Sequence, residues 1–110
     1  MSVLTEKTFT ALEIRDTDSH TGDTVFNGDY TIKTIIIENG LDQIVTFQCQ
    51  GSMHADFSNM FLIGGTWDIS ASINTYQSCD TYFPYWRLIA TCAVAPTTGD
   101  LTVHVIGVPT

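Results

Sequence analysis

Apolar and polar residues alternate along most of this chain with a period of two, as they do in half-buried β-strands. The clearest case is the last quarter, where two such runs flank the segment Ala95–Asp100. One face of the first run carries Trp86, Leu88, Ala90, Cys92 and Val94, and one face of the second carries Leu101, Val103, Val105 and Gly107. Alternating runs on both sides of a loop that contains Pro and Gly predict an antiparallel hairpin with one face on a core.

The same alternation predicts seven to eight short strands. We expect them at Thr8–Arg15, Asp29–Glu38, Gln43–Gln50, Phe61–Ile63, Trp67–Ile73, Pro84–Val94 and Leu101–Val108, with a short ribbon near Thr24–Phe26. Turns are expected at Asp16–Asp23 and Gly64-Gly65, and Glu38–Asp42 should join two strands as a hairpin because it contains Asn39-Gly40. No window of the sequence shows sustained helical periodicity.

A chain of 110 residues is long enough to bury one core and too short for two. The fold class that follows is all-β, a single antiparallel β-sandwich of jelly-roll-like type that spans residues 1–110. Within it, residues 1–28 are expected to form an N-terminal arm or an edge segment.

One predicted strand is apolar on both faces, because Ile35–Ile37 places three isoleucines in a row. Two later strands also carry apolar residues opposite their core faces. Either loops of the same chain cover these second faces, or a neighbouring subunit packs on them. We expect a subunit contact, formed by Ile35, Ile37, Ile89, Ile106 and Val108.

The negative net charge of the chain argues against nucleic acids and anionic membranes as partners. Twelve acidic residues against four basic ones give a net charge of −8, and charged residues make up only 15% of the chain. Nucleic acid needs clustered Lys and Arg, which are absent, and the same argument excludes anionic membrane surfaces. No segment approaches the ~20 apolar residues of a membrane helix. The N-terminus lacks the basic and apolar regions of a signal peptide, so we expect synthesis in a cytoplasm.

The sequence contains no strong metal-binding motif. Asp16–Asp23 alternates oxygen-bearing residues, but the sixth and twelfth positions of a calcium loop hold Thr21 and Asn27 instead of Gly and Glu. We expect a solvated acidic turn, with an irregular calcium site as the alternative. The histidines show no paired motif, and Cys49, Cys79 and Cys92 include no CxxC, so buried thiols are expected in preference to a disulfide or metal site. We expect no metal and no cofactor.

Catalytic motifs are equally weak. The loop Gly51–Asn59 holds Ser52, His54, Asp56 and Ser58, but residues of one short loop rarely reach triad geometry, and no Gly-x-Ser-x-Gly elbow is present. The sequence therefore predicts no enzymatic activity. An aromatic group could stack on sugars, or it could fill a core edge or anchor an interface, and we favour the packing or interface role. Its members are Trp67, Tyr76, Tyr82, Phe83, Tyr85 and Trp86.

From Tyr30 onward the chain contains three recognisable segments: the run TIKTIIIENGLDQIVTFQCQGS, a Gly-Gly-Thr-Trp segment and the run YFPYWRLIATCAVAPTTGDLTV. Their characteristic positions are Asn39-Gly40, Gln48 to Ser52, Pro84 to Leu88 and Ala95 to Gly99. In these segments the chain resembles small β-sandwich virion structural proteins of tailed bacteriophages, of the capsid-decoration, neck or tail type.

The resemblance implies a virion component made in the host cytoplasm. We therefore expect a non-enzymatic structural subunit of a virus particle, which forms a homo-oligomer and binds a larger shell of major capsid or other virion protein. The alternative is a carbohydrate-binding β-sandwich module, which the aromatic group and the acidic turn would serve.

Overall fold

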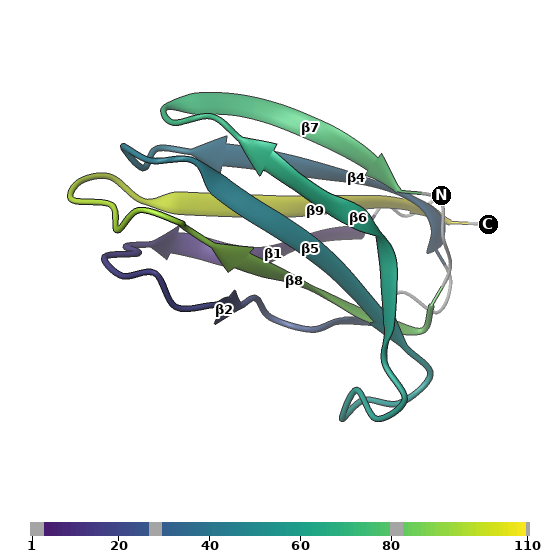
Figure 1. Ribbon diagram of the computed structural model, residues 1–110. Helices are drawn as coiled ribbons and strands as arrows, with labels where there is room; N and C mark the ends of the chain where they lie inside the picture. The colour runs from purple at the N-terminus through teal and green to yellow at the C-terminus, as the bar shows by residue number, and fades with distance from the viewer. Residues whose placement is uncertain (1–3, 27–29, 80–82, 110) are drawn as a thin grey trace.

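The computed structural model describes residues 4–26, 30–79 and 83–109, which form nine strands in two facing antiparallel sheets (Figure 1). Sheet A contains, in spatial order, β1 (Leu4–Leu12), β9 (Leu101–Pro109), β4 (Tyr30–Asn39) and β7 (Ile73–Cys79). Sheet B contains β2 (His20–Thr21), β8 (Tyr85–Thr91), β5 (Val45–Ser52) and β6 (Phe61–Ile69), and β3 (Val25–Phe26) also pairs with β8. The all-β sandwich is thus confirmed, whereas the jelly-roll-like connectivity stays a prediction.

The core lies between the two sheets and is built from the inward positions of the alternating runs. The predicted inward residues of the last two strands are buried, namely Trp86, Leu88, Ala90, Cys92, Leu101, Val103 and Val105. Val94 differs from the prediction and is 58% exposed, because β8 ends at Thr91 and Val94 belongs to the following loop. No helix long and apolar enough to cross a membrane occurs in the part of the chain that the structure describes.

The two predicted hairpins are wrong in the same way. Strands β8 and β9 do not pair with each other: β8 belongs to sheet B and β9 to sheet A. Likewise β4 and β5, joined at Asn39-Gly40, lie in opposite sheets. Alternation shows that one face of each strand is buried, and this holds equally for strands that face each other across a core. Both connections are therefore crossings between the layers.

These two crossings touch each other at one end of the sandwich. The Gly40 N–H donates to the Asp100 carbonyl oxygen over 2.8 Å. Gly99 has φ +86°, and a Cβ placed there would lie 1.8 Å from the Gly40 carbonyl oxygen. Only a glycine fits this backbone contact.

Side chains tie the same end together. The buried Asn39 amide donates to the carbonyl oxygens of Ser70 (3.0 Å), Gln43 (3.3 Å) and Ile69 (3.4 Å), and its oxygen accepts the Leu41 N–H. One side chain thus joins the end of β4 to the ends of β5 and β6. Buried amides require such partners, so Asn39 fixes the positions of these connections.

The strands of the middle of the chain also differ from prediction. A single strand, β6, runs through Gly64-Gly65 where a turn is expected, and the register of its partner β5 shifts between Phe47 and Cys49. Gly64 has φ +70°, which marks a bulge and not a chain reversal. Strand β7 was not predicted, because its sequence INTYQSC lacks apolar alternation. Strand β2 lies in the segment expected to be a turn.

Candidate interaction surface

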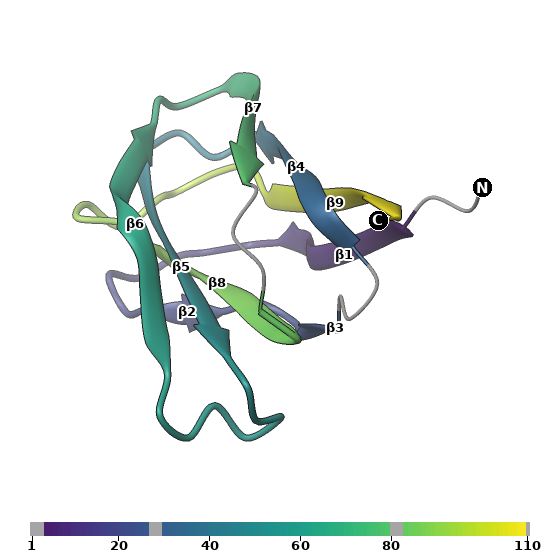
Figure 2. The same cartoon turned by 90° about the vertical axis from the view of Figure 1, so that its right-hand side faces the viewer.

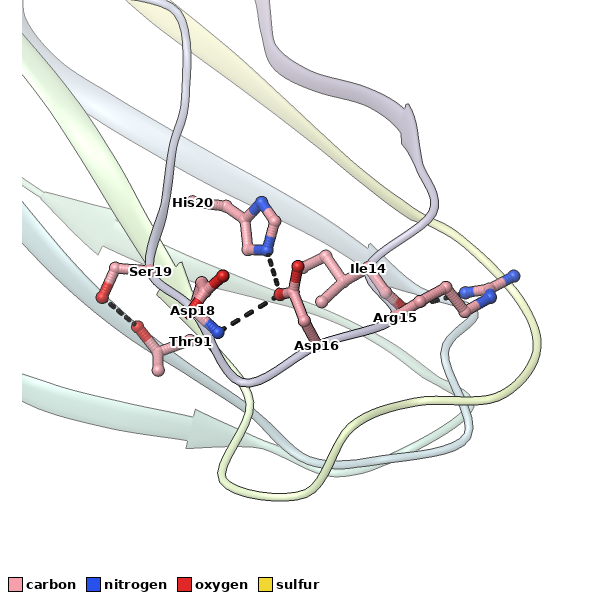
Figure 3. A network of polar contacts seen from close by, with 7 residues as sticks. All are labelled: Ile14, Arg15, Asp16, Asp18, Ser19, His20 and Thr91. Carbon is pink, nitrogen blue, oxygen red and sulfur yellow. Dashed lines mark hydrogen bonds and ion pairs between the residues drawn. The ribbon is translucent and has the colours of Figure 1, made fainter.

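The acidic turn is a set of local contacts at the surface. His20 Nε2 lies 2.7 Å from Asp16 Oδ1, which also accepts the Asp18 N–H, and Ser19 Oγ contacts Thr91 Oγ1 of β8 (Figure 3). The contact with His20 lowers the pKa of the Asp16 carboxyl. Asp16, Asp18 and Asp23 are exposed, as expected, and Asp29 lies outside the described residues. No arrangement of three or more metal-ligating side chains occurs among residues 4–26, 30–79 and 83–109.

The Ser, His and Asp residues of the β5–β6 loop shape its backbone. The Ser52 hydroxyl donates to the Ser58 carbonyl oxygen and accepts the His54 N–H, both over 3.0 Å. Asp56 Oδ1 accepts the Ser58 N–H over 3.0 Å, and this bond lowers the pKa of the Asp56 carboxyl. The Ser52 hydroxyl is thus bonded to backbone groups, and these contacts stabilise the turn.

Two of the three cysteines lie in the core. Cys49 and Cys92 are both buried in the core, which confirms the interpretation of both as small core residues. Burial raises the pKa of the Cys92 thiol, so this thiol is held in its protonated form. The Cys79 side chain lies outside those that the structure describes.

The residues of the predicted aromatic group lie at separate places in the structure and do not form one platform. Trp86 is buried in the core, and Trp67 stacks on Phe47 at its edge, with ring centroids 5.0 Å apart. Phe83 stacks on Phe61 at 5.6 Å. Tyr76 lies on β7 in the other sheet and is 71% exposed, while Tyr82 lies outside the described residues. The described rings that are buried or stacked therefore contribute to packing.

The predicted interface residues do not form one surface. Ile35 and Ile37 are buried between the sheets, so they pack on the chain's own core and cannot form the outward contact expected of them. Of the three consecutive isoleucines of β4, Ile36 points outward and is half-buried. Ile89 and Ile106 are half-buried on the outer faces of sheets B and A, and the Val108 side chain lies outside the described ones. Contact with a subunit through these outer faces stays a prediction.

Of the eight large apolar residues that are exposed among the described side chains, four lie on the β5–β6 hairpin. Both views show this hairpin projecting beyond the body of the sandwich (Figures 1 and 2). Its exposed apolar residues are Met53, Met60, Phe61 and Leu62, and we call this cluster the hairpin tip. The run Phe61-Leu62-Ile63 at the start of β6 is the available sequence signal, because three consecutive apolar residues in a strand must place at least one outward.

Contacts between the β5–β6 loop and sheet B anchor the hairpin. Phe57 folds back onto the outer face of sheet B, where the Arg87 guanidinium carbon lies 4.0 Å from the ring centroid. Arg87 Nε donates to Gln50 Oε1 over 2.8 Å, and Gln50 contacts Gln48 in turn. Phe57 has φ +58° and Asn59 has φ +54°, a strained backbone that these contacts hold in place. The apolar tip is thus displayed by an anchored loop.

No protein-family model matches this chain, and no curated protein sequence matches it. Solved structures do share its fold. PBSX exported protein XepA superposes with a TM-score of 0.71 at 10% identity, over 97% of this chain and 37% of XepA. PirA gives 0.54 at 12% identity, over 94% and 91%, and SPBc2 prophage-derived protein YomS gives 0.51 at 16% identity, over 94% of each chain. At these identities the likeness shows the fold alone.

Proposed function

We propose that this chain is a non-enzymatic structural subunit of a phage particle, which associates with copies of itself and binds a larger protein shell. Its structural neighbours include the phage-derived proteins XepA and YomS, which supports an association with phage. The virion location and the shell are proposals that rest on this likeness together with the surface described above.

The observation that carries the proposal is the hairpin tip. Exposed apolar side chains gathered on one projecting element are typical of surfaces that dock on another protein. Asp56 is the only Asp, Glu, Lys or Arg between Met53 and Leu62, so little of the −8 charge lies where contact would form. Because Phe57 and Arg87 anchor the loop, docking would lose little conformational entropy.

Binding to particles tests the docking role of the hairpin tip. Particles purified from a strain that lacks this gene are mixed with the chain and sedimented. We expect the parent chain to sediment with the particles and the double variant Phe61→Ser, Leu62→Ser to remain in solution. The matched control is Ile44→Ser, Val94→Ser, which removes two similarly exposed apolar residues from the other end of sheet B.

Three outcomes decide the proposal. Loss of binding in the tip variant alone supports it. Equal binding by both variants shows that the tip is not the docking surface. If antibodies against the chain label no particle from the wild-type strain, the assignment to the virion is wrong.

The carbohydrate-binding alternative depended on one platform of aromatic rings. Instead, Trp86 lies in the core, Trp67 at its edge, Phe83 against Phe61 of the hairpin tip and Tyr76 on the outer face of sheet A, so we favour the structural subunit. A glycan array separates the two functions, because specific retention of one sugar class would support the alternative.

A further inference from the structure

Strand β7 is a free edge of sheet A. It pairs with β4 at seven consecutive positions, from Asn39 opposite Ile73 to Lys33 opposite Cys79, without a register shift. Among the described residues, β4 is the only strand it pairs with. In an antiparallel strand every second residue directs its N–H and C=O away from its neighbour, so β7 presents a regular row of backbone donors and acceptors.

The other three sheet edges are protected in ways that β7 is not. Strand β1 carries Glu6 and Lys7 and is interrupted by two register shifts. One edge of sheet B is made of two strands, β2 and β3, of two residues each, and the other edge is β6. Strand β6 carries Asp68 and the bulge at Gly64. Charges, bulges and shortness are the usual defences against edge-to-edge pairing, and β7 has none of them.

An exposed apolar surface lies beside this edge. Tyr76 is directly opposite Ile36 of β4, and Ile36 is directly opposite His104 of β9, so the three side chains form one row across the outer face of sheet A. Tyr76 and Ile36, with Thr34, Asn74 and Thr75, line a shallow hollow next to β7. Ile73, at the start of the strand, is exposed as well.

The distribution of charge is compatible with a second copy of the chain as the partner at this edge. Each chain carries −8, so two copies repel each other over most of their surfaces. Strand β7 contains no charged residue, which makes it a place where a second copy can approach without repulsion. We propose that two copies of this chain associate through β7, pairing antiparallel so that the two A sheets join into one continuous sheet. This inference rests on the self-association in the proposed function and names its surface.

The sequence of β7 suits pairing with itself. With Tyr76 on the two-fold axis, Thr75 lies opposite the partner's Gln77, and Asn74 lies opposite the partner's Ser78. Residues directly opposite in such a pair have Cβ atoms about 4.5–5.5 Å apart. The two Tyr76 rings then meet on the outer face, where they cover the hollow next to Ile36.

Sedimentation velocity over a concentration series tests the inference. We expect the parent chain to show a monomer–dimer equilibrium and Tyr76→Lys to raise the dissociation constant ~tenfold or more, since it places two ammonium groups opposite each other. Val94→Lys adds the same charge at a similarly exposed residue far from β7 and should dimerise as the parent does. Thermal melts confirm that both variants are folded.

A covalent trap gives an independent positive test. In a Cys79→Ser background, Tyr76→Cys should form a disulfide-linked dimer under mild oxidation, because the two Cα atoms at the axis would lie within the range of a disulfide. Val94→Cys in the same background should not. Equal cross-linking of the two variants would overturn the inference.

The outcomes separate this inference from the proposed function. If the chain dimerises and Tyr76→Lys dimerises equally well, the chain self-associates through another surface and the β7 contact is wrong. If the parent chain is a monomer at every concentration, both the β7 contact and self-association fail.

Discussion

Gly99 is the residue on which the contact between the two sheet crossings depends. Its φ of +86° is costly for any L side chain, and its position against Gly40 leaves no space for a Cβ. We expect Gly99→Ala to lower the free energy of unfolding by at least ~2 kcal/mol, since it combines backbone strain with a steric clash. Urea unfolding followed by circular dichroism measures this loss.

Gly65→Ala is the matched control, because nothing lies within 4 Å of a Cβ placed at Gly65. This substitution should change stability by less than ~0.5 kcal/mol, as surface substitutions usually do. Similar losses in the two variants would show that the contact between the crossings does not constrain the fold.

Asp42 links the same two loops through its charge. Its carboxylate accepts the Thr97 hydroxyl over 2.5 Å and the Thr97 N–H over 2.9 Å, and these bonds lower the pKa of the Asp42 carboxyl below 3.8. A lowered pKa stabilises the fold above the unfolded-state value, and the stabilisation is lost as pH falls through the folded-state value. We therefore expect the melting temperature to fall below about pH 4 and to fall less steeply in Asp42→Asn.

Melting curves between pH 7 and pH 3 measure this dependence. Asp18→Asn is the control, because it removes the same charge from an exposed position in the acidic turn. An acid limb in Asp42→Asn as steep as that of the parent would show that the bonds to Thr97 contribute nothing to stability.

At the scale of elements, each strand has one face in the core and one outside. Substitutions on the inner face should lower stability, whereas substitutions on the outer face should affect association. Leu88→Ala removes a fully buried side chain of β8 and should cost ~2–5 kcal/mol, with Val103→Ala on β9 costing somewhat less. That loss is a large share of the ~5–15 kcal/mol of a small domain. Ile106→Asp lies on the outer face of β9 and should leave the subunit folded while weakening the second contact that we predict for the outer face of sheet A, separate from the β7 edge.

Thermal melts and sedimentation profiles of Leu88→Ala and Ile106→Asp check this prediction, with the exposed Val94→Ala as a neutral reference. An unfolded Ile106→Asp subunit would show that this residue supports the fold, and association equal to that of the parent would show that the outer face of sheet A has no role in assembly.

For the whole molecule, net charge controls solubility. Asp16, Asp18 and Asp23 are exposed, so repulsion between molecules should be strong at neutral pH. Near the sequence pI of 4.3 the net charge vanishes, and we expect turbidity to reach its maximum there. Light scattering across a pH titration measures it, with the reversal on return to pH 7 as the control. A solution that stays clear through pH 4.3 would contradict this expectation.

The sequence by itself determined the fold class and the composition of much of the core. Period-two alternation predicted the strands and the burial of residues such as Leu88, Val103 and Cys92, because a pleated strand with one buried face requires that pattern. Turn-forming residues also marked where the chain leaves a strand at Gly40 and near Gly99, although both turns were interpreted as hairpins and are crossings between the sheets. Alternation and turn preferences depend on residues that are close in sequence, so they can be recognised from the sequence alone.

Only the tertiary structure decided which strands pair, and therefore which residues are free. It placed β8 opposite β9 across the core, put Ile35 and Ile37 inside, and left β7 and the hairpin tip exposed. Alternation gives the same pattern for strands that pair side by side and for strands that face each other. The polar strand β7 forms because β4 offers it an edge of backbone hydrogen bonds, a partner that its own sequence does not encode.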